Sequence, residues 1–509
     1  MRQFGLILAF LLFALPAGAK DIYVAANQAS TGTGTGCSTA KSRAWVAAST
    51  SWGTASNQIG PGTTVHLCGT FTGTPGEQLF VVRVNGTSTS PITIKWETNA
   101  NLTAPYWSAF GAINAANRSY IVFDGGTNGI IQNTQNGSGR TYVQQSRGLY
   151  IGACNFCTVK NITIANIYVR SNYNDLAVVQ TAENCLFIIG ANNLTVSHMT
   201  CHDAGWGIAG AGNNFTMEYC NIYNIDHGIA FGVSGTKTSG FWIHDNHIHG
   251  YTNWDSPTNA YHHDGLHLWG SAGGVVTNGA IYNNVFDGDS GVNTTAHIYL
   301  QYSIQGVSVY NNVFLVPANR AITSIWFEAS GGSTSNNSAY NNFVSGGAHT
   351  GGSALYADGQ SNFSAYNNIL LGARSDISLQ GGTTLSSAGV DHNIYLQLAD
   401  YGDRNTFGHN TAVFQTLSAW QSSCHCDAHS QLVHLSQVNA TSLGQLLSGS
   451  VAIGAASNLI NLATGTMSAL SKDKVGALRP ASGNWDAGAY KFGSTALPSS
   501  PTGLTATVQ

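Results

Sequence analysis

Charged side chains are scarce in this chain. Asp, Glu, Lys and Arg make up 8% of the 509 residues, and the formal net charge is −4. An ordinary globular protein has about 25% charged residues. Such a chain has no basic patch that could hold nucleic acid, and it offers few cations to a strongly polyanionic partner. We therefore expect no nucleic acid among its partners.

Long apolar runs are also rare. Only residues 4–15, which follow Arg2, form one, and Ala17-Gly18-Ala19 comes directly after it. A basic residue, a short apolar run and a small-residue cleavage site predict a secretory signal over residues 1–19, because the run is too short to span a bilayer. We expect an exported monomer, extracellular or periplasmic, with no membrane anchor.

Helix-forming runs are few, whereas hydrophobic residues reach 43% and aromatic residues 10% of the chain. This apolar content is too high for a disordered chain and predicts a large core. Export permits disulfides among the nine cysteines. Cys154 and Cys157 fit a bridge or buried thiols better than a metal site, and Cys201 and Cys220 could stack or bridge. The odd count leaves at least one thiol unpaired in a monomer.

A repeat organises the rest of the sequence. Residues 281–286, 309–314, 339–344 and 365–370 are near copies built on Tyr-Asn-Asn, with intervals of 21 to 38 residues along the aligned Asn column. That column contains Asn166, Thr200, Asn221, Asn246, Asn284, Asn312, Asn342, Asn368 and Asn393. Such spacing suits one turn of a solenoid with variable loops better than the repeats of about 40–50 residues in a β-propeller. Stacked Asn residues at the turns would form a ladder.

Each repeat contains a second strand with period-two alternation. Its copies begin at Gly207, Gly228, Gly265, His297, Ser324, Ser353 and Asp376. Short strands with a turn at each repeat predict an all-β fold in which every coil pairs with its neighbours. We therefore predict a parallel β-helix of about ten coils.

The chain resembles the pectate-lyase-like β-helix superfamily. The resemblance runs over about residues 60–492 and rests on residues 62–67, 91–95 and 121–125 and on the closing segment 479–490. It implies a right-handed, single-stranded parallel β-helix over residues 20–492, with less regular coils and a cap over 397–492. Residues 493–509 resemble a linker or the truncated start of a fibronectin type III module.

Aligning the second strands on their inward aliphatic residue predicts an unusual outer wall. The residues expected on it are His267, Trp269, His297, Tyr299, Gln301, Trp326 and Glu328, with His227 and Asp264 at its edge. Aromatic faces can stack on sugar rings, and amides and carboxylates can bond hydroxyl groups. The alternative is an aromatic cluster buried beneath a loop.

Two short motifs resemble those of polygalacturonase-type glycoside hydrolases. Asp264-Gly265-Leu266 is similar to the Asp-Gly-Ile part of their Asn-Thr-Asp-Gly-Ile motif, and His227-Gly228-Ile229 is similar to their Gly-His-Gly-Ile motif. The resemblance implies a catalytic role for Asp264 and an assisting role for His227. The order of the two motifs is reversed, and the family's Gly-Asp-Asp and Arg-Ile-Lys motifs are not found.

The hypothesis is an enzyme that cleaves glycosidic bonds of a polysaccharide, with hydrolysis favoured over elimination. Hydrolysis needs one group that acts as an acid and a second that acts as a base or nucleophile, and both are usually carboxyl groups. The candidate catalytic residues are Asp264, His227, His267, Asp226, His297 and Tyr299. The candidate substrate-binding residues are Trp269, Trp326, Gln301, Glu328, His263 and Asp203.

A lyase or an epimerase acting on a uronic-acid polymer is the first alternative. His267 or His297 with Tyr299 could transfer the protons. Calcium or an Arg or Lys would have to neutralise the carboxylate, and neither an Asp cluster nor a wall cation is apparent. We expect no cofactor, unless calcium serves a lyase, and no metal site; the histidines of residues 244–249 fit surface positions. A non-catalytic sugar-binding or adhesin-like protein is the second alternative.

Overall fold

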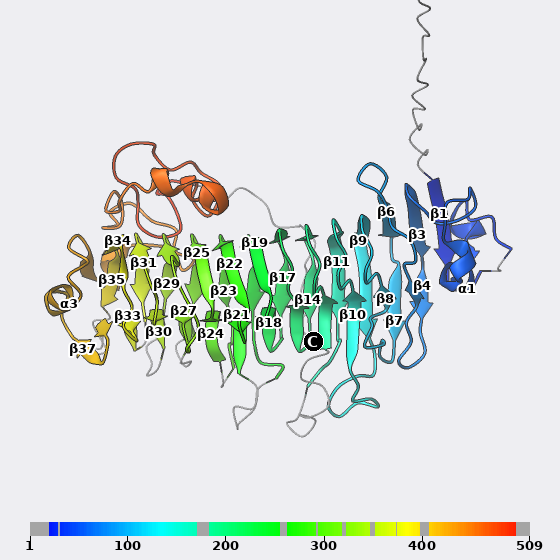
Figure 1. The fold of residues 1–509 in the computed structure, drawn as a ribbon, viewed down its shortest axis with the longest axis horizontal. Helices are drawn as coiled ribbons and strands as arrows, with labels where there is room; N and C mark the ends of the chain where they lie inside the picture. The colour runs from blue at the N-terminus through cyan, green and yellow to red at the C-terminus, as the bar shows by residue number, and fades with distance from the viewer. Residues whose placement is uncertain are drawn as a thin grey trace, which may run out of the picture.

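The computed structural model describes residues 20–28, 31–170, 183–254, 262–291, 294–317, 322–346, 352–372, 374–397 and 407–494. The expected signal segment and the tail after residue 494 lie outside these ranges. Among the described residues, no helix is both long and apolar enough to cross a membrane. The chain winds as a long parallel β-helix (Figure 1).

One face of the helix is a sheet of 13 strands among the described residues, which we call the wall sheet. Each strand pairs in parallel with the same strand of the next coil, except the last pair, which is antiparallel. Its strands, in spatial order, are β5 (Phe80–Val81), β8 (Ile113–Asn114), β10 (Ser146–Tyr150), β12 (Glu183–Phe187), β15 (Trp206–Ala209), β18 (His227–Ser234), β21 (His263–Ser271), β24 (Thr294–Tyr302), β27 (Thr323–Glu328), β30 (Ser353–Asp358), β33 (Ser375–Gln380), β36 (Phe407–His409) and β37 (Ala412–Phe414).

The other faces form two further rows of parallel strands, joined by the long strands β9 (Ile121–Asn133) and β11 (Thr158–Ala165). One row consists of β1 (Lys20–Ala25), β3 (Thr63–Cys68), β6 (Ile92–Trp96), β13 (Thr195–Ser197), β16 (Phe215–Glu218), β19 (Lys237–His244), β22 (Val275–Tyr282), β25 (Ile304–Tyr310), β28 (Ser338–Tyr340), β31 (Phe363–Tyr366) and β34 (Leu385–Asp391), with β2 (Lys41–Ser42) paired to β1. The other consists of β4 (Thr70–Thr72), β7 (Asn101–Ala104), β14 (Thr200–His202), β17 (Asn221–Tyr223), β20 (His247–His249), β23 (Val285–Asp287), β26 (Val313–Leu315), β29 (Phe343–Ser345), β32 (Ile369–Leu371), β35 (Ile394–Gln397) and β38 (Gln431–His434).

The Tyr-Asn-Asn repeat has two separate structural roles. The first Asn of each pair adopts a left-handed backbone at the turn, as at Asn283 and Asn311, with φ of 56° and 54°. Asn tolerates that conformation better than most residues. The second Asn is buried, and its side chain bonds to the next coil; Asn312 donates to Asn342 Oδ1 at 3.1 Å.

This ladder runs from Asn246 to Asn393 and confirms the predicted stacking for those coils. Before it the predicted column is out of register, by one residue at Thr200 and Asn221 and by four residues at Asn166. Asn221 pairs with His247, and the neighbouring Cys220 donates its backbone N–H to Asn246 Oδ1. The weaker repeats lack the Asn pair, so the alignment had no second residue to correct it.

The C-terminal region covers two surfaces of the stack. Helix α3 (Leu417–Cys424) brings Trp420 into the main core beyond the last coils. The later segment, which begins with α4 (Leu435–Val438), folds back along one side of the solenoid (orange in Figure 1). There Trp485 packs in a second buried cluster with Tyr310 and Tyr340.

Four disulfides link cysteines that are 2 to 31 residues apart, namely Cys37–Cys68, Cys154–Cys157, Cys185–Cys201 and Cys424–Cys426. Cys201 therefore bridges to Cys185 and not to Cys220, which remains a buried free thiol. The one-repeat spacing of Cys201 and Cys220 was a misleading signal, since the bridge spans only part of a coil.

Candidate active site

The central strands of the wall sheet bring the predicted residues into aligned columns. His227 on β18 pairs with Asp264 on β21. His267, Tyr299 and Trp326 follow one another on β21, β24 and β27. The aliphatic residues that precede His267 and Tyr299 on these strands, Leu266 and Ile298, are fully buried in the core. The period-two alternation therefore correctly predicts which residues point outward.

Three imidazoles converge on one carboxylate oxygen in this sheet. Asp264 Oδ2 lies 3.3 Å from His227 Nε2, 3.3 Å from His262 Nε2 and 3.6 Å from His267 Nδ1. His267 Nδ1 also lies 3.4 Å from His227 Nε2. We call His227, His262, Asp264 and His267 the His/Asp cluster.

Polar groups behind the cluster hold its rings in place. His227 Nδ1 lies 2.8 Å from Asp226 Oδ2, and the other oxygen of Asp226 lies 2.9 Å from His263 Nδ1. Asp264 Oδ1 accepts the backbone N–H of Ala296 at 2.9 Å. The contacts of His227 and Asp264 leave their other polar atoms, Nε2 and Oδ2, facing the centre, and His263 fixes the carboxylate of Asp226.

Burial and these contacts shift the pKa values in opposite directions. Burial alone raises the pKa of Asp264, but the contacts with His227 and His262 outweigh it and lower the pKa to about 2. For His227, burial lowers the pKa, and the two flanking carboxylates, Asp226 and Asp264, raise it to about 10. Burial dominates at His267 and lowers its pKa to about 3. The carboxylate of Asp264 is therefore ionised and His267 neutral near neutral pH.

A second polar group lies on the next two coils. The Tyr299 hydroxyl donates a hydrogen bond to Glu328, and Gln301 Nε2 donates to both, at 2.6 Å to Tyr299 and 3.1 Å to Glu328. Burial and the neighbouring Glu328 raise the pKa of Tyr299, so its hydroxyl stays protonated. The Tyr299 ring stacks on His267 with ring centroids 4.7 Å apart, which connects this group to the His/Asp cluster.

Aromatic rings flank the cluster on both sides. Trp206 packs edge to face against Trp269, with ring centroids 6.2 Å apart. The ring centroid of Trp326 lies 5.0 Å from that of Tyr299 and 5.3 Å from that of Tyr356. The indole of Trp269 lies over Gly232, where any Cβ would lie 2.0 Å from the ring. Glycine on β18 therefore allows Trp269 to lie along the sheet.

Three predicted residues are too buried to touch a substrate. Asp264 and His263 have no exposed surface, and Asp226 is 3% exposed. Asp264, expected at the edge of an open wall, is instead covered by histidines, and Asp226 and His263, candidates for catalysis and substrate binding, are buried with it. They are supporting residues, whereas His227 at 5% and His267 at 7% lie at the margin.

Two predicted residues lie elsewhere. His297 points into the interior, where it contacts Phe286 and Phe314 and bonds the Tyr251 hydroxyl at 3.2 Å. The register between β21 and β24 shifts just before this position, and His297 faces inward like Gly265 on β21, where a Cβ would meet Phe286. Asp203 lies at the end of β14, in another row, where it bonds His202 and Asn224.

Other residues of the site were missed from the sequence. His262 precedes β21 and had no aligned counterpart. Tyr356 and Asp358 extend the outward columns onto β30, because Leu355, not Ala354, pairs with Ile325. Arg147 is a wall cation after all: it lies on β10, and its column continues through Asn184 and Trp206 to His227.

Three groups of side chains in the described part of the chain could hold a metal ion. In each, the ligand atoms lie within 4.8 Å of one another. One group is the His/Asp cluster, the second is His247, His249 and Asp287, and the third is Asp391, His392 and His429.

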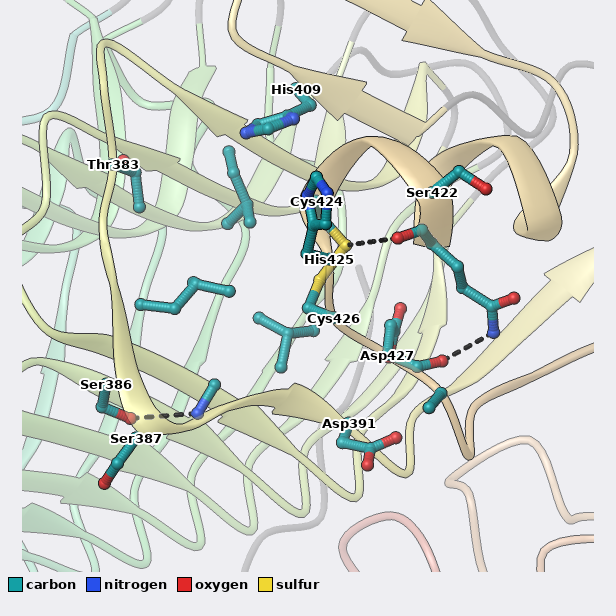
Figure 2. Close-up of a pocket in the computed structure, with 16 residues that line it drawn as sticks. Thr383, Ser386, Ser387, Asp391, His409, Ser422, Cys424, His425, Cys426 and Asp427 are labelled. Atoms are coloured by element: carbon teal, nitrogen blue, oxygen red, sulfur yellow. Dashed lines mark hydrogen bonds between the residues drawn. A yellow bond between two sulfur atoms is a disulfide. The ribbon is translucent and has the colours of Figure 1, made fainter.

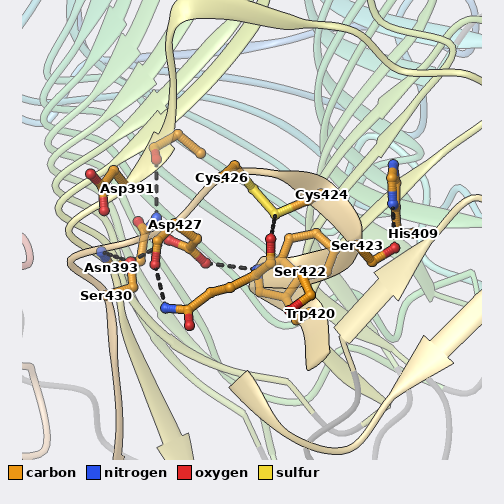
Figure 3. Close-up of a disulfide and its surroundings, with 12 residues drawn as sticks. Asp391, Asn393, His409, Trp420, Ser422, Ser423, Cys424, Cys426, Asp427 and Ser430 are labelled. Carbon is orange, nitrogen blue, oxygen red and sulfur yellow. Dashed lines mark hydrogen bonds between the residues drawn. A yellow bond between two sulfur atoms is a disulfide. The ribbon is translucent and has the colours of Figure 1, made fainter. Parts of the chain in front are cut away.

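A cavity of about 840 Å³ lies at the C-terminal end of the helix, away from the predicted site residues (Figure 2). His409, His425 and the Cys424–Cys426 disulfide line it. Asp427 lies between the last coil and α3 and accepts a hydrogen bond from Trp420 Nε1 at 2.8 Å (Figure 3). None of the residues predicted for the site lines this cavity.

No protein-family model and no curated protein sequence matches the chain. Among solved structures, the pectate lyase Pel9A aligns with a TM-score of 0.50 and 16% identity over 93% of this chain and 96% of that one. The lacto-N-biosidase from Eubacterium ramulus aligns with a TM-score of 0.44 and 11% identity, over 82% of this chain and 68% of that one. The surface protein and adhesin PfbA of Streptococcus pneumoniae aligns with a TM-score of 0.44 and 12% identity, over 70% and 91%.

At these identities the likeness concerns the fold alone, and Pel9A carries it. Together with the parallel register of the strands, it means that this chain has the right-handed parallel β-helix fold of pectate-lyase-like proteins.

Proposed function

We propose that the protein is an exported enzyme that binds a polysaccharide on the wall sheet and cleaves its glycosidic bonds, with hydrolysis favoured over elimination. The observation that carries the proposal is the position of the His/Asp cluster within a row of aromatic rings. A substrate chain would lie across the coils, parallel to the helix axis.

The aromatic rings supply the binding surface in this proposal. Trp206, Trp269, Trp326 and Tyr356 are each partly exposed, so their faces can contact sugar rings. Ligand sites typically combine such apolar rings with a few convergent polar groups. Gln301, which is also partly exposed, would bond sugar hydroxyls.

Glu328 would be the group that reaches the glycosidic bond. It is partly exposed and would act in turn on the leaving oxygen, as acid, and on water, as base, while the Tyr299 hydroxyl, which keeps its proton, holds it by a hydrogen bond. Asp264 is ionised but enclosed, so it would act on the histidines around it and not on the sugar.

A lyase is the second candidate, because a neutral His267 stacks directly on Tyr299. That pair would supply a base and an acid for elimination. Within the described part of the wall sheet, no neutraliser for the substrate carboxylate lies beside the pair, and Arg320, the cation nearest to the wall in sequence, lies outside the described residues. Arg147 is four coils from β21, which corresponds to about 19 Å at the usual strand spacing.

A panel of neutral and uronic-acid polysaccharides tests the proposal. Hydrolysis releases reducing ends without ultraviolet absorbance, and elimination releases both reducing ends and absorbing unsaturated products. Glu328→Gln should lower turnover at least about 100-fold, within the usual contribution of a general acid or base. Glu218→Gln is the matched control: it removes a partly exposed carboxylate on β16, in another row of the solenoid, and should leave turnover within a few-fold.

Binding without products from any polymer would contradict the enzyme proposal and would instead support a sugar-binding or adhesin-like protein. Equal activity of the wild type and Glu328→Gln would contradict the role given to Glu328.

A further inference from the structure

The geometry points to a transition-metal site in the wall sheet, in which His227, His262, Asp264 and His267 bind one divalent ion of the zinc type. The inference goes beyond the proposed function, since ion binding does not require that the protein cleave a sugar.

The spacing of the four ligand atoms fits tetrahedral coordination. Zinc ligands lie about 2.0–2.2 Å from the ion, so the edges of the tetrahedron measure about 3.3–3.6 Å. The four distances given above between these atoms are 3.3, 3.3, 3.4 and 3.6 Å. These are four of the six edges. The other two, from His262 Nε2 to the nitrogens of His227 and His267, are no longer than 4.8 Å, so a small movement of the partly exposed His262 ring would complete the tetrahedron.

Two atoms at this centre have unused bonding capacity. Asp264 Oδ2 and His262 Nε2 are buried and have no well-aligned hydrogen bond among the described residues. A buried carboxylate oxygen without a partner is costly. An ion at the centre would satisfy both atoms.

The surrounding groups direct ring nitrogens toward the same point. His227 Nδ1 lies 2.8 Å from Asp226 Oδ2, so Nε2 faces the centre and would give up its proton when the ion binds. His267 Nε2 lies 3.4 Å from Gln301 Oε1, an arrangement that leaves Nδ1 as the free nitrogen. Carboxylate and amide partners of this kind orient metal-bound histidines in many proteins.

The donor set selects the class of ion. Three imidazole nitrogens and one carboxylate oxygen suit zinc and neighbouring divalent transition metals. Calcium prefers six to eight oxygen ligands, which this cluster does not offer. The proposed site, for an ion that prefers nitrogen ligands, differs from the expectation from the sequence of no metal site, or of calcium in a lyase.

The other two groups fit an ion less well. His247 is already bonded to Asp287 at 2.7 Å, and His429 to Asp391 at 2.6 Å, so their carboxylates have partners. The side chain of His429 is 67% exposed, so water competes for its ligand atoms.

The test is a titration of chelator-treated full-length protein with zinc chloride, with no sugar present. We expect one high-affinity equivalent per chain by calorimetry and by elemental analysis after dialysis. Cobalt(II) in the same site should give the intense visible absorption of a four-coordinate ion. His262→Ala should weaken zinc binding more than about 100-fold, because loss of an outer-shell partner alone costs 10–100-fold.

His262→Ala is suited to the test because this side chain is 43% exposed and its removal leaves the core intact. His198→Asn is the matched control: it removes an exposed imidazole outside the cluster at a left-handed position that Asn tolerates. Circular dichroism verifies the fold of both variants.

No high-affinity equivalent in the wild type, or equal zinc affinity in the wild type and His262→Ala, would overturn the inference. A bound ion in a protein that cleaves no polysaccharide would leave the metal site standing and contradict only the proposed function.

Discussion

His297 is enclosed by Phe286 and Phe314 in the interior, and burial lowers its pKa to about 3 from the usual 6.5. The unfolded chain therefore binds a proton near pH 6.5, which the folded chain accepts only near pH 3. The contribution of the neutral ring to stability is complete above pH 6.5 and is lost as the pH falls toward 3.

The free energy of unfolding of the wild type should fall between pH 7 and pH 4. We expect this fall to be about 2–4 kcal/mol smaller in His297→Leu, since one pKa unit corresponds to about 1.4 kcal/mol. Urea unfolding at several pH values measures this difference. Parallel pH profiles for the two proteins would show that the ring is not held neutral.

Cys220 is a second isolated group in the interior. Burial is the main cause that raises the pKa of its thiol, to about 12, and a thiol reacts as the thiolate. Ellman's reagent should therefore modify less than about a tenth of the protein in native buffer and one thiol per chain in denaturant. Rapid modification of the native protein would mean that this part of the core opens easily.

At the scale of the strand and turn, the Asn ladder connects successive coils through buried amide groups. Asn312 accepts from the backbone and side chain of Asn284 and donates to Asn342 and to the Ile281 carbonyl. Asn312→Ala would leave several of these groups without partners, and each buried unsatisfied group costs about 1–3 kcal/mol.

We expect Asn312→Ala to lower the free energy of unfolding by about 2–4 kcal/mol in a denaturant titration. The control is Asn128→Ala, which breaks a similar Asn–Asn contact with Asn99 on the exposed surface and should cost less than about 1 kcal/mol. Similar losses in the two variants would mean that burial of the ladder contributes nothing extra.

Strands with strict alternation were predictable from the sequence, and their ends were not. Leu266 and His267 take the inward and outward positions that period two requires. The alternation breaks within β24, where the register with β21 shifts, so His297 turns inward. A misplaced start of the copy at Ser353 hid Tyr356. The strand alignment had no column for His262, because this residue precedes β21 and reaches the cluster from outside the strand.

At the scale of the whole molecule, the C-terminal segment covers an apolar side of the solenoid. Trp485 is fully buried there with Tyr310 and Tyr340. Asn367 adds contacts, since its side chain bonds both the N–H and the carbonyl of Ser457. The segment is thus attached by side-chain packing and scattered hydrogen bonds and adds no strand to the wall sheet.

Trp485→Ala should release this segment while the coils stay folded. Truncation of a buried Trp costs about 3–5 kcal/mol, and the loss falls on the segment alone. Limited proteolysis followed by mass spectrometry should then show cleavage between residues 435 and 494 with a resistant core. Uniform digestion of the entire chain would show instead that segment and solenoid unfold together.

The four ligands of the His/Asp cluster come from two adjacent turns of the chain, His227 from β18 and the other three from β21 and the residue before it. In a solenoid each repeat contacts only its neighbours, so unfolding can spread from either end. An ion that joins two middle repeats would stop this unfolding from passing from one half to the other. Ion supply would then set the melting temperature of the middle of the molecule, by the amount that tight binding to the folded state alone provides.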